Sequence, residues 1–109
     1  MSEQLLRLRQ SRETSEATQV INFLRIFVDF CGIDISRWYV GITNDWERRQ
    51  REHKVKDYSR AYQTKTEGVA RLVERFLIEM GMQGGDGGGT GEDDAVWVYV
   101  YLIQRHTVE

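Results

Sequence analysis

The stretch WYVGITNDWERRQREH, residues 38–53, joins a strand pattern to a helix pattern and sets the centre of the expected fold. Residues 37–43 are rich in aromatic and β-branched side chains, which favour a β-strand. Asn44 then fits a helix N-cap, and Glu47 completes a capping-box pattern for a helix that runs to about Lys54. We therefore expect a strand that leads directly into a short, basic helix.

Longer helices are expected on both sides of this stretch. Apolar residues recur at helical spacing between residues 14 and 31, and Gly32 supplies the stop. After the stretch, Thr64 and Glu67 form a second capping-box pair, and an apolar stripe continues until Gly81. The first of these helices is apolar enough to lie in the core or against a partner chain. One expectation is therefore a homodimer through helix 14–31.

The clearest strand pattern lies in residues 95–103, where aromatic side chains alternate with valines. Because a two-stranded sheet is only marginally stable, we expect a third strand, from near residues 33–35 or from a partner chain. The segment that carries Tyr58 and Tyr62 is expected to be a loop. The predicted class is α+β, a small antiparallel sheet flanked by helices.

The length of 109 residues predicts one domain, residues 1–109. Residues 1–13 have a charged, broken pattern that fits either a short helix or a poorly ordered arm. Residues 81–94 combine a run of glycines with three acidic residues, which is typical of a flexible loop.

Composition limits the classes of function. A formal net charge of -2 and a pI near 5.7 count against a protein that coats nucleic acid, because such binding uses many basic residues. Cys31 is the single cysteine and cannot form an internal disulfide, and we find no basic-then-apolar leader, so we expect a cytoplasmic protein. No apolar run approaches the roughly 20 residues that span a bilayer, so no membrane role is expected.

Residues 46–60 are locally basic, with six basic residues against three acidic ones. Together with nearby aromatic side chains, this run is suited to tracking a nucleic-acid backbone and stacking on bases. A solvated charged face is the commoner meaning of such a run. The candidate nucleic-acid contacts are Gly41, Trp46, Arg48, Arg51, Lys54 and Lys56.

Residues 38–53 resemble the second signature of the GIY-YIG nuclease superfamily. The resemblance covers the Tyr-Val-Gly that begins at Tyr39, then Thr43, Arg49 and His53, with matched spacing. It implies a GIY-YIG-like fold and a metal-dependent nuclease that hydrolyses phosphodiester bonds in DNA, with RNA not excluded.

The family's first signature strand is missing from its usual place, because a helix is expected there. The segment WVYVYL, residues 97–102, is similar to one form of that strand. A circularly permuted arrangement would bring it beside Tyr39, with Tyr101, or else Tyr99, in place of the first-signature tyrosine. The alternative is an ordinary final strand whose tyrosines pack as aromatic side chains.

The resemblance assigns catalytic roles to Tyr39, Arg49, His53 and Tyr101. The tyrosines would orient or activate the attacking water, and Arg49 would hold the phosphate from the helix face that it shares with His53. The neighbouring arginines already form i,i+4 pairs with glutamates, which leaves Arg49 without a partner on its own helix. Without the resemblance, His53 fits a half-exposed histidine at a helix end.

The resemblance also implies one metal ligand, and Glu74 matches it best. Its carboxylate would hold one Mg²⁺ or Mn²⁺, because hard cations prefer oxygen ligands. Glu67 and Glu79 are the rivals on the same helix. The alternative is that Glu74 lies at the edge of the apolar stripe and reaches solvent.

Three functional hypotheses follow from these residues. The leading one is a one-metal endonuclease that cleaves DNA. The second is a catalytically degenerate GIY-YIG-like domain that binds nucleic acid or a protein partner, which the displaced first signature and the acidic pI motivate. The third is an interaction domain that dimerises through helix 14–31.

Overall fold

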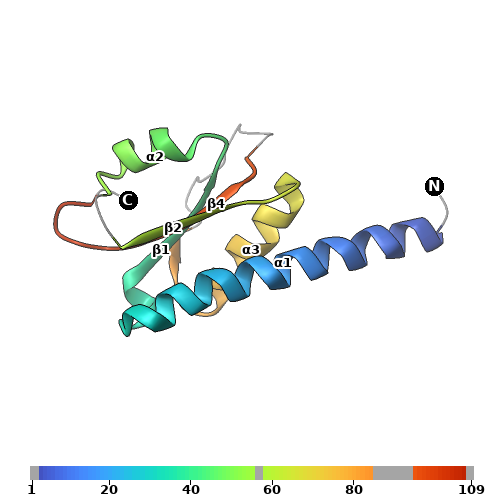
Figure 1. Ribbon diagram of the computed structural model, residues 1–109, viewed down its shortest axis with the longest axis horizontal. Coiled ribbons are helices and arrows are strands. Elements are labelled where there is room, and N and C mark those ends of the chain that lie inside the picture. Colours follow the sequence, from blue (N-terminus) through green and yellow to red (C-terminus); the bar gives the residue numbers. More distant parts are fainter. Residues whose placement is uncertain (1–2, 56–57, 85–94, 108–109) are drawn as a thin grey trace.

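The computed structural model describes the backbone of residues 3–55, 58–84 and 95–107, and side chains within these ranges from residue 12 onward. It places helices on both faces of one small sheet (Figure 1), so the predicted α+β class is confirmed. Most of the predicted glycine-rich loop lies outside the described residues, as does Lys56. The elements in chain order are α1 (Glu3–Cys31), the 3-10 helix η1 (Ile35–Arg37), β1 (Trp38–Thr43), α2 (Trp46–Glu52), β2 (Ser59–Gln63), α3 (Glu67–Glu79), β3 (Gln83–Gly84) and β4 (Trp97–Leu102).

The sheet has the strand order β2-β4-β1-β3, so β4 lies between β2 and β1. β4 is antiparallel to both neighbours, and its register with β1 sets Tyr101 opposite Tyr39 and Tyr99 opposite Gly41. β3 runs parallel to β1. The sheet is therefore mixed, with one parallel pair added to the antiparallel pairs that the sequence predicts.

Two local expectations are wrong. Instead of a strand near residues 33–35, the chain forms η1, because the Asp34 carboxylate accepts hydrogen bonds from the Ser36 N–H (2.8 Å) and hydroxyl (2.6 Å). Residues 59–63, expected to be a loop, form β2 and pair with β4. Their local pattern is weak, and the strand depends on its tertiary neighbour.

Both capping residues lie one or two positions beyond those predicted. The N-cap of α2 is Asp45, not Asn44, because the Asp45 carboxylate accepts a hydrogen bond from the Arg48 N–H (3.1 Å). The N-cap of α3 is Thr66, not Thr64. The Thr64 hydroxyl instead donates a hydrogen bond to the backbone carbonyl of Val96, just before β4, at 2.8 Å.

The two faces of the sheet carry different helices: α1 and α3 pack on one face and α2 on the other (Figure 1). Because successive strand residues point to opposite faces, the valines of β1 and β4 join the apolar core under α1 and α3, while their tyrosines face α2. α1 is continuous from Glu3, so residues 3–13 belong to it. None of the described helices combines the length and apolarity needed to cross a membrane.

Candidate active site

Three tyrosines from two adjacent strands form a cluster beneath α2. Tyr39 comes from β1, and Tyr99 and Tyr101 come from β4, where their i,i+2 spacing puts both on the same face. The ring centroids of Tyr39 and Tyr101 lie 5.1 Å apart, and the rings of Tyr99 and Tyr101 are nearly parallel, at 8°. We call these three residues the tyrosine cluster. It brings together residues from the β1 and β4 segments of the sequence.

His53 joins the cluster from the C-cap position of α2. Its Nε2 lies 3.0 Å from the Tyr99 hydroxyl oxygen, and its Nδ1 lies 3.1 Å from the Tyr101 hydroxyl oxygen. A neutral imidazole has one N–H and one bare nitrogen, so one phenol accepts a hydrogen bond from the ring while the other donates one to it. His53 is 6% exposed, so the alternative of a half-exposed histidine at the helix end is wrong.

Gly41 makes room for Tyr99. A Cβ built on Gly41 would overlap the phenol oxygen and the Cζ atom of Tyr99, so only glycine leaves space for this ring. Trp46, the first residue of α2, stacks on Tyr99 with ring centroids 4.7 Å apart and an interplanar angle of 27°. Tyr99 is therefore held between the β1 backbone and an indole. These contacts give Gly41 and Trp46 a packing role beside the predicted role in nucleic-acid contact.

Burial and nearby charges shift the pKa of Tyr99. Burial is the main cause that raises the pKa of Tyr99 above its ordinary value near 10. The neighbouring Tyr39 and Tyr101 and the Glu74 carboxylate also raise this pKa, and the Arg49 guanidinium lowers it. Tyr99 is therefore a neutral phenol at physiological pH, and the charges of Arg49 and Glu74 both act on it.

Arg49 has an ionic partner on its own helix, contrary to expectation. Its Nη1 lies 3.5 Å from Glu52 Oε2, and the same carboxylate lies 3.2 Å from Arg48 through its other oxygen. The i,i+4 spacing predicts that Glu52 pairs with Arg48 alone, whereas it pairs with both arginines. The Arg49 side chain is 24% exposed, so it is partly buried.

Glu74 enters from α3 and is partly buried. Its Oε2 is shielded from solvent, and no hydrogen-bond donor reaches that oxygen among the described residues. Burial raises the pKa of the Glu74 carboxyl, an effect that the Arg71 charge opposes. The rivals on α3 differ, because Glu67 pairs with Arg71 and Glu79 is exposed. Glu74 is thus the one carboxylate of the three with a buried oxygen that lacks a donor in the described structure.

A buried carboxylate oxygen without a donor fits a hard cation such as Mg²⁺. Among the residues that the structure describes, no three His, Cys, Asp or Glu side chains come together as a metal cage. A cation at Glu74 would have one protein carboxylate and would complete its shell with water or substrate oxygens, which is how Mg²⁺ commonly binds.

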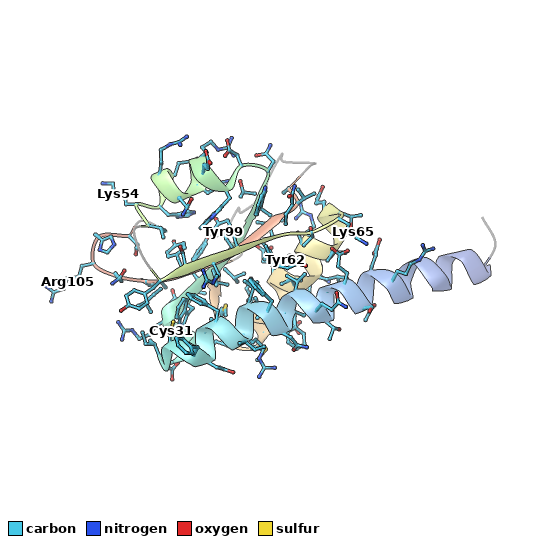
Figure 2. The ribbon with its side chains drawn as sticks, in the orientation of Figure 1. Cys31, Lys54, Tyr62, Lys65, Tyr99 and Arg105 are labelled. Atoms are coloured by element: carbon cyan, nitrogen blue, oxygen red, sulfur yellow. The ribbon has the colours of Figure 1, made fainter. Side chains whose placement is uncertain are left out.

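The predicted nucleic-acid contacts lie mainly on the outer side of α2. Arg51 and Lys54 line a hollow of about 570 Å³ with Glu47, Gln50 and Val55, and Figure 2 shows Lys54 on this side of the molecule. Arg48 is held by Glu52 and donates to the Asn44 side-chain oxygen (3.3 Å). Arg48 and Arg51 belong to α2, and Lys54 follows its C-terminal end.

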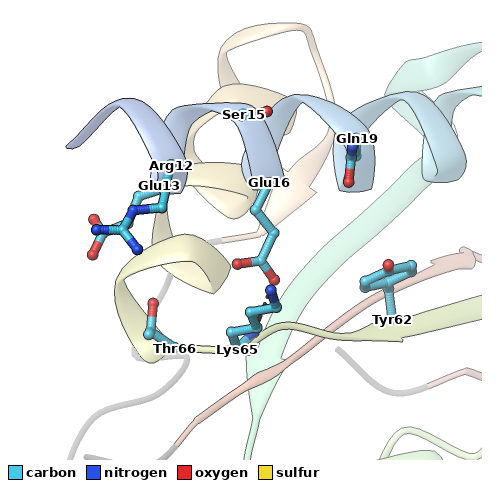
Figure 3. Close-up of a pocket in the computed structure, with 8 residues that line it drawn as sticks. All are labelled: Arg12, Glu13, Ser15, Glu16, Gln19, Tyr62, Lys65 and Thr66. Atoms are coloured by element: carbon cyan, nitrogen blue, oxygen red, sulfur yellow. Dashed lines mark hydrogen bonds between the residues drawn. The ribbon is translucent and has the colours of Figure 1, made fainter. Parts of the chain in front are cut away.

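A second hollow, of about 510 Å³, lies on the opposite side of the sheet between α1 and the start of α3 (Figure 3). In it the Glu16 carboxylate accepts a hydrogen bond from the Lys65 backbone N–H (2.9 Å). None of the predicted catalytic or metal-binding residues lines this hollow. It therefore contributes nothing to the candidate site.

The structure gathers Tyr39, His53, Tyr101 and the alternative residue Tyr99 into one contact cluster. Arg49 lies on α2, on the same side of the sheet as this cluster, whereas Glu74 lies on α3, which packs against the other face. The sequence pattern favours Tyr101 over Tyr99 as the first-signature tyrosine, although both lie on the same face of β4. The useful signal was Gly41, because glycine in a strand often marks a close approach by another group. In comparisons with known proteins, no family model, no curated sequence and no solved structure matches this chain.

Proposed function

We propose that this protein is a divalent-metal-dependent endonuclease that hydrolyses phosphodiester bonds in DNA, with a site of the GIY-YIG type supplied in permuted chain order. One observation carries the proposal: β1, α2 and β4 converge on a buried phenol–imidazole–phenol chain. Hydrolysis of a phosphodiester needs a positioned water, neutralisation of the phosphate charge and proton transfer. Each need has a candidate group here.

Arg49 is the candidate for phosphate binding. Its guanidinium is planar and can donate two parallel hydrogen bonds to phosphate oxygens. It is only partly exposed, and Glu52 occupies one side of it at 3.5 Å. A phosphate that binds here would compete with Glu52, and Glu52 would retain Arg48 as a partner at 3.2 Å.

Tyr39 is the candidate for orienting the attacking water, because it is the most exposed phenol of the tyrosine cluster. Tyr99 is unsuited to act as a base, since its raised pKa disfavours the phenolate. His53 links Tyr99 to Tyr101 through its two ring nitrogens. Because a neutral imidazole carries one N–H, the two hydroxyls take opposite donor and acceptor roles toward His53, which fixes the orientation of both phenols.

Glu74 is the candidate cation ligand. A bound Mg²⁺ or Mn²⁺ would supply charge neutralisation at the phosphate and at the leaving oxygen. Burial raises the pKa of the Glu74 carboxyl, because the ionised carboxylate is poorly solvated there. A bound cation would stabilise the ionised form. The oxygen without a donor among the described residues supports this role.

The direct test is nicking of supercoiled plasmid DNA in Mg²⁺ or Mn²⁺. Glu74→Gln and Arg49→Ala should each reduce the nicking rate by about 100-fold or more, because each removes charge stabilisation at the reacting phosphate. The matched controls are Glu79→Gln on the same helix and Arg25→Ala on α1, both at exposed positions. No cleavage of any DNA or RNA by the wild-type protein, or equal activity in Glu74→Gln, would contradict the proposal.

A second function is favoured by a different observation. Tyr99 and Tyr101 are 2% and 0% exposed, which suits a closed structural cluster, and Arg49 already has a carboxylate partner. A degenerate domain that binds nucleic acid or a protein partner without cleavage would have these properties. Salt-sensitive DNA binding that weakens in Arg51→Glu, with no nicking in either metal, would favour this function over the first.

A further inference from the structure

The largest exposed apolar side chains of α1 lie beside an open edge of the sheet. Phe30 is 89% exposed and Ile26 is 69% exposed, and Phe23 is also exposed. They line a hollow of about 270 Å³ with Phe27 and with Arg60 of β2. We call Phe23, Ile26, Phe27 and Phe30 the α1 outer patch.

β2 forms the edge of the sheet next to this patch. Within the described part of the chain, β2 pairs with β4 and with no other strand. The carbonyl of Tyr58 and the N–H of Thr64 face β4. Because backbone groups alternate in direction along an antiparallel strand, the N–H and C=O groups of Ser59, Ala61 and Gln63 point away from the sheet.

The edge lacks the usual protection against pairing. Natural edge strands are often guarded by charged side chains or proline. The sequence of β2 is SRAYQ, with Arg60 as its one charge, and the Arg60 guanidinium lies 4.8 Å from the Phe27 ring centre, over α1. Tyr62 also turns to α1, with its ring centroid 5.3 Å from that of Phe23. In Figure 2, Tyr62 lies on the α1 side of the sheet.

We propose that the α1 outer patch and the β2 edge together form a homodimer interface, occupied by a second copy of this chain. A two-fold axis perpendicular to the sheet at Ala61 would pair β2 with the partner's β2 in antiparallel order and lay the two α1 helices side by side. Ala61 would face its own symmetry mate, and Ser59 would face Gln63. A second copy offers both an open strand of the same length and the same apolar helix, as a two-fold symmetric interface requires.

The patch is large enough for this role. From the usual size of buried aromatic side chains, the exposed part of Phe23, Ile26 and Phe30 is on the order of 400 Å², about half of what one partner contributes to a standard interface. The paired strands would supply further contact and backbone hydrogen bonds. Gln19 and Asn22 on α1 are uncharged, and Arg60 is the charged residue that lines the hollow with the patch.

The experiment is sedimentation velocity of the full chain over a range of concentrations, with Phe30→Asp as the test variant and Phe76→Asp as the matched control. Phe76 is also an exposed phenylalanine, at 43%, but it lies on α3 away from β2. Phe30→Asp should weaken dimerisation by at least about tenfold, and Phe76→Asp should leave it unchanged. A wild-type protein that stays monomeric, or a dimer that Phe76→Asp disrupts and Phe30→Asp does not, would overturn the proposal.

Amide hydrogen exchange tests the strand pairing separately. The Ala61 N–H should exchange more slowly as the wild-type concentration rises, and it should not do so in Phe30→Asp. If the wild-type dimer forms while Ala61 exchanges at the monomer rate, the β2 pairing is refuted. Circular dichroism of both variants should match the wild type, because both positions are already exposed to solvent.

Discussion

The two faces of the same pair of strands are built from opposite kinds of side chain. Toward α1 and α3, β1 and β4 present aliphatic residues such as Val40, Ile42 and Val98, which join one continuous apolar core. Toward α2 they present the tyrosine cluster, closed by His53 and Trp46. Both faces are buried, but only one of them buries hydroxyl groups and an imidazole.

The α2 face is built around polar groups whose burial is costly. A buried hydroxyl or imidazole destabilises a fold unless it is hydrogen-bonded, and His53 meets this requirement through two phenols at once. Aliphatic side chains could fill the same space without needing hydrogen-bond partners. The α2 face therefore has requirements of hydrogen bonding and shape that the aliphatic side chains of the α1/α3 face do not have, and variants can measure each requirement.

The largest effect on stability is expected on the apolar face. Leu24 of α1 is fully buried in the apolar core, at 0% exposure. Leu24→Ala should reduce the free energy of unfolding by about 2–5 kcal/mol, because it removes buried apolar surface and leaves a cavity. Urea denaturation followed by circular dichroism measures it. Thr18→Ala, at an exposed position on the same helix, is the control and should change the value little. A loss below about 1 kcal/mol would mean that the apolar face is loosely packed.

The next effect concerns shape on the polar face. Gly41→Ala should lower the free energy of unfolding by about 1–3 kcal/mol, because the new methyl group would force the Tyr99 ring to move. Gly68→Ala is the matched control, since its Cβ would make only ordinary contacts in α3. That change should be neutral or stabilise by up to about 1 kcal/mol. Equal effects at both glycines would show that Tyr99 is not confined by β1.

Hydrogen bonding on the polar face is tested by removing one phenol oxygen. Tyr101→Phe keeps the ring but takes the partner from His53 Nδ1, and it should cost about 1–2 kcal/mol of unfolding free energy. Tyr62→Phe, on the α1 side and only partly buried, should cost less than about 0.5 kcal/mol. The chemical shifts of the His53 ring should change in Tyr101→Phe and not in Tyr62→Phe. If both variants are equally stable, the phenol–imidazole chain contributes no net stability.

The smallest effect is a pH dependence at Glu74. Burial raises the pKa of its carboxyl above the ordinary value of 4.5, so the folded state binds this proton more tightly than the unfolded state does. The stability from this group is fully present below pH 4.5 and is lost as the pH rises through the folded-state pKa. In EDTA at neutral pH, Glu74→Gln should therefore melt at a slightly higher temperature than the wild type. Added Mg²⁺ should raise the melting temperature of the wild type alone, and a stabilisation of Glu74→Gln by Mg²⁺ would place the cation elsewhere.

Sequence predicted best those features that depend on near neighbours in the chain. The strand and helix of residues 38–53, and the apolar stripe of α3, follow from local patterns. β2 was not predicted, because SRAYQ has a weak strand pattern and is fixed by its pairing with β4. Asn44 and Asp45 are equally good N-cap residues, so the sequence does not show at which of the two the helix begins. The structure has Asp45 as the N-cap.

The candidate site divides in the same way. Tyr39, Arg49 and His53 lie on one short segment, so their spacing was visible in the sequence. The pairing of Gly41 with Tyr99 depends on the register between strands far apart in the chain, which no local pattern sets. The Arg49–Glu52 ion pair is a choice among side-chain rotamers, and spacing alone could not distinguish it from an Arg48–Glu52 pair.

The central position of β4 has a consequence for how the chain folds. β1 and β2 do not touch each other in the sheet, and both depend on a strand that pairs Leu102 with Trp38, more than half the chain length away. Contacts between such distant residues form slowly, because the intervening chain must first be ordered. Until β4 pairs with them, β1 and β2 expose unpaired edges and the tyrosine cluster cannot form. The step that completes the sheet is therefore also the step that assembles the candidate site, so a partly folded chain would have neither.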